Sequence, residues 1–174
     1  IFAKGADWIP SDSFVTRTTR KDLEFYIKSA QDANMNMLRV WGGGYYESDD
    51  FYELCDRSGI LVWQDFAFAC MTYPLWEREF LDSVKQEVTD NIRRLRYHAS
   101  LALWCGNNEM EMFQVKSEFD GNDVTRAHYI RMFEHIIPHV LRREDPDTYY
   151  WPASPSSGGS FDAPNDPDRG DVHY

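Results

Sequence analysis

The chain carries the stretch LALWCGNNE at residues 101–109. Its first five residues are apolar, and a continuous apolar run of this length predicts a strand that is covered on both faces, as in parallel sheets. Two amides and a carboxylate, Asn107, Asn108 and Glu109, follow a single glycine. A carboxylic acid at a strand end inside an aromatic cleft can act as a general acid, and a neighbouring amide can bind a substrate hydroxyl. The pattern alone fits equally well a local role for Glu109, as a helix cap or in an ion pair.

Similar apolar segments recur along the chain and alternate with helical patterns. Strands are expected at residues 2–10, 37–41, 60–66, 100–105 and 148–153, with a sixth beginning at residue 172. Amphipathic helices are expected at residues 21–36, 48–59, 80–95 and 125–145. Thr19, Ser48 and Thr125 are expected to cap three of these helices. This alternation predicts an α/β protein with a parallel sheet.

The ends of the predicted strands help to choose between an open doubly wound sheet and part of an eight-stranded barrel. Trp8, Trp41, Asp65 and the pair Asn108–Glu109 lie at the ends of the first four strands, so polar and aromatic groups would collect at one rim. In a (β/α)8 TIM barrel the active site lies at this carboxyl rim. A complete barrel takes roughly 250 residues, so the sequence predicts a partial barrel of about five strands.

Composition excludes several classes of partner. The 174 residues include 18 Lys and Arg against 29 Asp and Glu, which gives a formal charge of −11. This balance opposes binding to a phosphate backbone, so no nucleic acid is expected as a partner. The apolar runs are too short to cross a bilayer, so no membrane partner is expected either. Aromatic residues make up 16% of the chain, which suits a large core or a pocket that stacks on sugar rings.

The cysteines indicate a reduced protein. Cys55, Cys70 and Cys105 form neither a disulfide framework nor a zinc-binding spacing, so buried thiols are expected. Free thiols and the lack of an Asn-x-Ser/Thr acceptor favour a bacterial cytoplasm, and a periplasmic location stays open. The chain begins at Ile1 and is expected to be a piece of a longer polypeptide.

Two further patterns have structural interpretations. His135 and His139 lie four residues apart, but Pro138 stands between them and the His-Glu-x-x-His pattern is not matched, which favours a structural pair over a zinc site. The run Gly42–Gly44 lacks the spacing of a phosphate-binding loop and predicts a tight turn. No metal and no cofactor are expected.

Several motifs resemble the glycoside hydrolases of family 2 and, within that family, the β-mannosidases most closely. They are KGADWIP at residues 4–10, NMLRVWGGG at 36–44, VWQDF at 62–66, WCGNNE at 104–109, ASP at 153–155 and GDVH at 170–173. The resemblance runs over nearly the whole chain. It implies a (β/α)8 catalytic barrel of which residues 1–174 are the N-terminal portion.

The resemblance also implies the site residues and the reaction. Glu109 takes the position of the acid/base at the end of the fourth strand, and Asn108 that of the asparagine that contacts the sugar 2-hydroxyl. Five further residues match positions that bind the sugar or hold the pocket in shape: Trp8, Arg39, Trp41, Asp65 and His173. The implied reaction is the hydrolysis of terminal β-D-mannosides with retention of configuration, by two glutamates.

One departure from the family pattern limits the expected activity. The family's nucleophile lies near the end of the seventh strand, beyond the strands that this chain supplies, so we expect the fragment to be inactive alone. A β-galactosidase or β-glucuronidase of the same family, and a carbohydrate-binding protein without activity, are the alternatives. Because a partial barrel exposes its strand edges and inner side chains, the fragment is also expected to self-associate.

Overall fold

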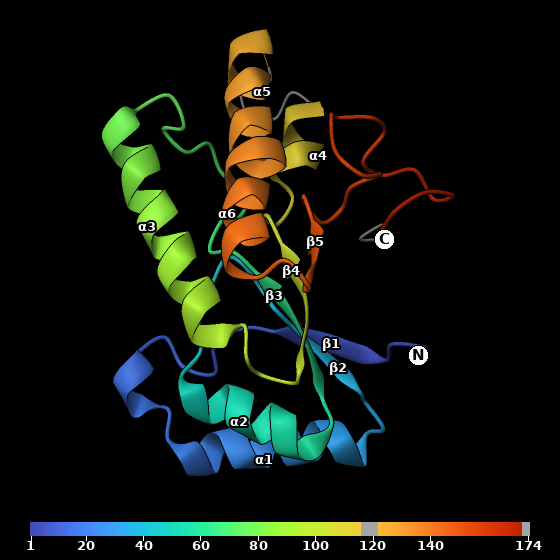
Figure 1. Ribbon diagram of the computed structural model, residues 1–174. Coiled ribbons are helices and arrows are strands. Elements are labelled where there is room, and N and C mark those ends of the chain that lie inside the picture. Colours follow the sequence, from blue (N-terminus) through green and yellow to red (C-terminus); the bar gives the residue numbers. More distant parts are fainter. Residues whose placement is uncertain (116–121, 172–174) are drawn as a thin grey trace.

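The computed structural model describes residues 1–115 and 122–171, and these form an α/β structure around one parallel sheet (Figure 1). The strands are β1 (Gly5–Trp8), β2 (Met37–Val40), β3 (Leu61–Asp65), β4 (Leu101–Cys105) and β5 (Tyr149–Trp151). Their order in the sheet is β1-β2-β3-β4-β5, and every neighbouring pair is parallel. A doubly wound sheet reverses its strand order at one point. The five described strands show no such reversal.

Helices fill the connections between the strands. They are the 3₁₀ turn η1 (Val15–Arg17), α1 (Arg20–Asp32), α2 (Asp49–Ser58), α3 (Arg78–Leu95), α4 (Met110–Val115), α5 (Asp123–Ile130), the π-helical segment η2 (Arg131–Ile136) and α6 (Ile137–Glu144). In Figure 1, α5, η2 and α6 run on from one another as one rod, α3 lies beside this rod, and α1 packs on α2. None of the helices in the described ranges combines the length and hydrophobicity that a membrane crossing needs.

Two of the local signals for the first two helices are confirmed, the Thr19 cap and the Gly59 end. Thr19 forms a capping box with Asp22, because its side chain accepts from the Asp22 backbone N–H and the Asp22 carboxylate accepts from the Thr19 N–H. Gly59 ends α2 in the left-handed region, with a φ of 66°. Ser48 takes the N-cap position of α2 without a side-chain cap bond.

The two faces of the sheet have different surroundings. Trp8, Val40, Val62 and Trp104 point toward the helices and are buried in the core. Because side chains alternate along a strand, Asp7, Arg39, Trp63 and Leu103 point to the opposite face. Residues of this face line two hollows of about 250 Å³ each. The described part of the chain therefore covers one face of the sheet and leaves the other uncovered.

The structure differs from the sequence-based expectations at several places. The first strand is Gly5–Trp8 and is shorter than predicted. Helix α4 lies in a stretch that was expected to have no element, and α5 is capped by the Asn122 side chain and not by Thr125. Trp63 lies within a strand that was expected to be covered on both faces, but its side chain lies on the uncovered face. The expected sixth strand, from residue 172, lies outside the described residues.

Candidate active site

Three strand ends bring Arg39, Asp65 and Asn108 together. Arg39 lies on β2, Asp65 ends β3, and Asn108 follows β4. Arg39 Nη2 lies 2.9 Å from Asp65 Oδ2 and 2.9 Å from Asn108 Oδ1, and Arg39 Nε lies 3.3 Å from Asp65 Oδ1. A two-point contact between a guanidinium and a carboxylate fixes the orientation of both groups. Arg39 therefore joins the ends of three neighbouring strands.

Asp65 has a fully buried side chain with several donors around its carboxylate. Besides Arg39, the Gly42 backbone N–H donates to Oδ2 at 3.0 Å and the Trp63 indole N–H donates to Oδ1 at 2.9 Å. Burial raises the pKa of Asp65, and the Arg39 charge and these donors oppose that effect. For Arg39, burial acts to lower the pKa, but the Asp65 carboxylate outweighs it and the pKa is raised. The guanidinium thus stays charged.

Glu109 lies at the end of the turn that follows β4, in a conformation that few residues adopt. Its φ is 63°, in the left-handed region, which costs energy in a residue other than glycine. Backbone bonds on both sides hold the turn: Asn108 N donates to Phe68 O at 2.9 Å, and Glu109 N donates to Ser154 O at 2.9 Å. The loops that follow β3 and β5 therefore fix the place of Glu109.

The Glu109 side chain contacts a thiol that no sequence motif assigned to the site. Cys70 Sγ lies 3.3 Å from Glu109 Oε2 and 3.1 Å from Asn108 Nδ2. Cys70 belongs to the loop after β3 and is partly buried. Its distance from Glu109 in sequence, 39 residues, hides this contact from any local pattern.

Asn107 supports the same turn from within the protein interior. No site role was predicted for it. Its amide nitrogen donates to Tyr129 Oη at 3.0 Å and to Pro152 O at 3.1 Å, and its Oδ1 accepts from Met110 N at 3.2 Å. The side chain is fully buried. Asn107 therefore ties the start of α4 to α5 and to the loop after β5.

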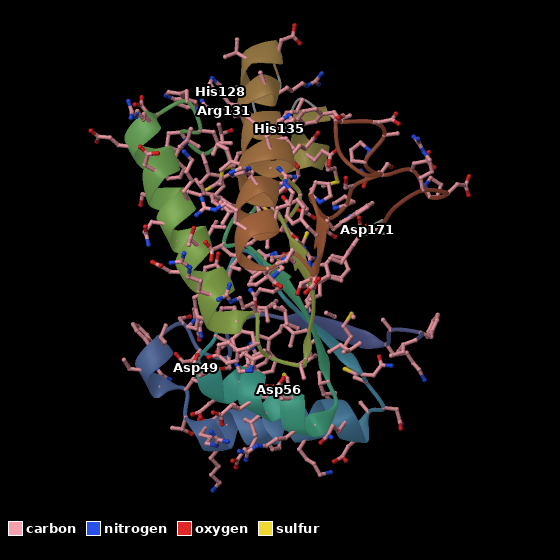
Figure 2. All side chains as sticks on the ribbon, in the orientation of Figure 1. Asp49, Asp56, His128, Arg131, His135 and Asp171 are labelled. Carbon is pink, nitrogen blue, oxygen red and sulfur yellow. The ribbon has the colours of Figure 1, made fainter. Side chains whose placement is uncertain are left out.

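Asp171, labelled in Figure 2, organises the loop after β5. Its Oδ1 accepts from Trp151 Nε1 at 2.6 Å and from Ser156 N at 3.0 Å, and its Oδ2 accepts from the Ser154 hydroxyl. Because Ser154 O holds the backbone of Glu109, Asp171 supports the turn indirectly. In the sequence, Asp171 stands out only as part of the motif GDVH at residues 170–173.

Glu111 is a second glutamate close to the turn, and it points into the protein. It is fully buried, and its Oε1 accepts from Phe161 N at 3.0 Å. Burial raises its pKa to about 7, and the nearby charges of Glu134 and Asp171 act in the same direction. Glu111 thus holds the loop around Phe161 close to the site.

The remaining predicted site residues do not join the Arg39–Asp65–Asn108 contacts. Trp41 is partly buried at the end of β2, and its ring lies where a Cβ on Gly43 would be. Trp8 lies in the helix-covered core, 4.7 Å between ring centroids from Phe51, and donates to Glu47 Oε1 at 2.9 Å. His173 lies outside the described residues.

The histidine pair lies away from the sheet. His135 is on η2, where Figure 2 labels it near Arg131, and both His135 and His139 are exposed. Within residues 1–115 and 122–171, no group of three or more His, Cys, Asp or Glu side chains is arranged to hold a metal ion.

Comparison with known proteins gives close relatives over the whole chain. No protein-family model matches it. A β-mannosidase of Bos taurus is 43% identical over 185 residues, which cover 100% of this chain and 21% of that protein. A β-mannosidase B of Emericella nidulans is 39% identical over 99% of this chain and 21% of its own length.

Comparison with solved structures also gives a β-mannosidase as a similar protein. The crystal structure of a β-D-mannosidase from Dictyoglomus thermophilum superposes with a TM-score of 0.92 at 44% identity and covers 100% of this chain and 21% of that one. An exo-chitosanase from Amycolatopsis orientalis, with a TM-score of 0.68 and 18% identity over 90% of this chain and 18% of its own, shares the fold. The chain is homologous over its whole length to the β-mannosidases, and it spans about a fifth of the length of these relatives.

Proposed function

We propose that the parent polypeptide hydrolyses terminal β-D-mannosides with retention of configuration. The observation that carries the proposal is the group of contacts at the strand ends, where Arg39 holds Asp65 and Asn108, and Cys70 links Asn108 to the Glu109 carboxylate. The relatives named β-mannosidases, which match the whole chain at about 40% identity, support the same reaction and substrate.

We further propose that the sheet is the first five strands of an eight-stranded barrel, with residues 1–174 as the N-terminal portion of the catalytic domain. The strands are all parallel and follow one another in sequence order, as barrel strands do. One face carries the helices, and the other is uncovered in the described residues. In a closed barrel that second face becomes the filled interior.

In this reaction Glu109 gives a proton to the oxygen of the leaving group and later takes one from the attacking water. Retaining hydrolysis needs a second carboxyl group about 5 to 5.5 Å from the first. We propose that the part of the parent outside this chain supplies it, and that the isolated chain has no turnover.

Asn108 is the proposed partner of the sugar 2-hydroxyl. Arg39 can only donate hydrogen bonds, so it holds the Asn108 oxygen and turns the amide nitrogen the other way. One N–H then donates to Cys70, and the nitrogen carries a second donor for a hydroxyl. Trp41 is proposed as an aromatic wall of the sugar site, and the resemblance offers His173 as a further site residue. Trp8 points into the helix-covered core and is not part of this proposal.

The test measures kcat/KM of the full-length parent on aryl β-glycosides of mannose, galactose, glucose and glucuronic acid. We expect the mannoside to be preferred, and Glu109→Gln to lower kcat/KM by about 10²- to 10⁴-fold, the usual share of general acid–base catalysis. Glu79→Gln, at an exposed position in the first turn of α3, is the matched control. Equal activity of Glu109→Gln and the control would reject the assignment.

A further inference from the structure

Cys70 connects two residues of the proposed site through its side chain. Its Sγ accepts from Asn108 Nδ2 at 3.1 Å and donates to Glu109 Oε2 at 3.3 Å. Both lengths are within the range of hydrogen bonds that involve sulfur. The Cys70 backbone is held as well, because its N–H donates to Asn108 O at 3.1 Å.

The backbone of Cys70 adopts a conformation that costs energy. Its φ is 51°, in the left-handed region, as is that of Glu109 at 63°. Non-glycine residues in this region are uncommon and cluster at functional sites, where the surrounding structure maintains them. Two such residues therefore face each other across the ends of β3 and β4.

The direction of the hydrogen bonds follows from the chemistry of the groups. The Arg39 guanidinium has donors only, so the amide oxygen of Asn108 faces it at 2.9 Å. The amide nitrogen of Asn108 then faces Cys70, and the sulfur has to accept. The thiol proton is left for Glu109, whose carboxylate accepts it. Donors and acceptors thus alternate in one sense from Arg39 to Glu109, which strengthens each bond in the series.

The thiol form of Cys70 is the stable one at neutral pH. Burial raises the pKa of Cys70, and the bond to Glu109 raises it further, while Asn108 and the Arg39 charge act in the opposite direction. A protonated thiol can donate, whereas a thiolate beside the Glu109 carboxylate would only repel it.

We propose that Cys70 is a positioning residue for the acid/base: its thiol holds the Glu109 carboxylate in one orientation and stabilises the ionised form. This inference rests on the proposed function. It adds a role for a residue in the loop after β3, which the strand-end motifs do not contain. Proton transfer to a leaving group depends on the alignment of the acid, so loss of the thiol affects the substrates that need this proton.

The experiment compares Cys70→Ala, Cys70→Ser and the wild type in the full-length parent, with two mannosides. A phenyl mannoside needs a proton on its leaving oxygen, and a 2,4-dinitrophenyl mannoside does not. For Cys70→Ala we expect kcat/KM on the phenyl mannoside to fall about fivefold, with a change of less than about twofold on the dinitrophenyl mannoside. We expect Cys70→Ser, which keeps a donor, to recover most of the loss.

The pH profile gives a second readout that a merely structural role would not change. Without the thiol donor, Glu109 keeps its proton to higher pH, so the alkaline limb of kcat/KM should move up by about half a pH unit. Cys55→Ala, which removes a buried thiol from α2, is the control and should leave the limb in place.

Three outcomes would overturn the inference. The first is a Cys70→Ala enzyme with unchanged kcat/KM on both mannosides. The second is an equal loss of kcat/KM on both mannosides with an alkaline limb that does not move, which indicates general damage to the fold. In either case a parent that depends on Glu109 keeps the proposed function intact. The third outcome is a parent whose hydrolysis does not depend on Glu109, and it would reject both the proposed function and this inference.

Discussion

The charge of Glu111 makes the free energy of unfolding depend on pH. Burial raises its pKa to about 7 from the ordinary 4.5, so folding favours the protonated form. This contribution to stability is fully present below the pKa of the unfolded chain. It is lost as the pH rises through the pKa of the folded state. The loss between pH 4.5 and 7 is about 3 kcal/mol, at 1.36 kcal/mol per unit.

Glu111→Gln should remove this dependence, because glutamine is neutral at every pH and has nearly the same shape. We expect the free energy of unfolding of the wild type to fall from pH 5 to pH 8 by about 3 kcal/mol more than that of the variant. Denaturant titrations of both proteins at equal concentration measure this, with Glu79→Gln as the control for an exposed carboxyl group. Parallel pH dependence in wild type and Glu111→Gln would contradict the expectation.

At the residue scale, motifs predicted the groups that lie at strand ends. Arg39, Asp65, Asn108 and Glu109 were expected at one rim. The structure brings the first three into contact, and Cys70 links Asn108 to Glu109. Cys70 could not be predicted in the same way, because it lies in a loop and not on a strand, and its own left-handed backbone brings the thiol to Glu109. Its thiol was expected to be buried, and the structure shows it only partly buried.

At the scale of the elements, Gly42 sets how closely the end of β2 approaches β3. A Cβ at this position would lie 2.6 Å from Phe68 O and 2.7 Å from Phe66 O, and both are backbone atoms. The Gly42 N–H donates to Asp65. Any side chain here therefore pushes the two strand ends apart and disturbs the Asp65 carboxylate.

Gly42→Ala is expected to destabilise the fold by about 2 kcal/mol, the usual effect of overpacking, and to lower the activity of the parent. Gly59→Ala is the matched control. There, a Cβ would meet no atom within 4 Å, and only the positive φ costs energy, about 1 kcal/mol. The activity and the melting temperature of both variants test this expectation. A Gly42→Ala parent as active as Gly59→Ala would contradict the role of this close approach.

Elements were predicted where the apolar periodicity is long or continuous. The pattern of Phe80, Val84, Val88, Ile92 and Leu95 indicated α3, and four of these five side chains are fully or nearly fully buried. Helix α4 has only six residues and follows the site turn, so it lacks the repeats that reveal a helix. Its position depends on Asn107 and on backbone contacts to distant loops.

At the scale of the whole molecule, the uncovered sheet face predicts the behaviour of the isolated chain. Met37, Trp63, Leu103 and Tyr149 lie along this face, and β1 and β5 are the edges of the described sheet. Apolar side chains and strand edges of this kind favour association. We expect a dimer or larger assembly of residues 1–174 in sedimentation velocity runs. A clean monomer at high concentration would contradict this expectation.

The most direct measurement of the central claim uses Glu109→Ala in the full-length parent with 2,4-dinitrophenyl β-mannoside and azide. This leaving group needs no proton, so the covalent sugar intermediate should form. It should then accumulate, because its hydrolysis lacks the general base. Azide attacks without a base. We therefore predict that azide raises turnover about tenfold or more and that the product is β-mannosyl azide. An α-mannosyl azide product, or turnover that does not respond to azide, would contradict the role of Glu109 as the acid/base.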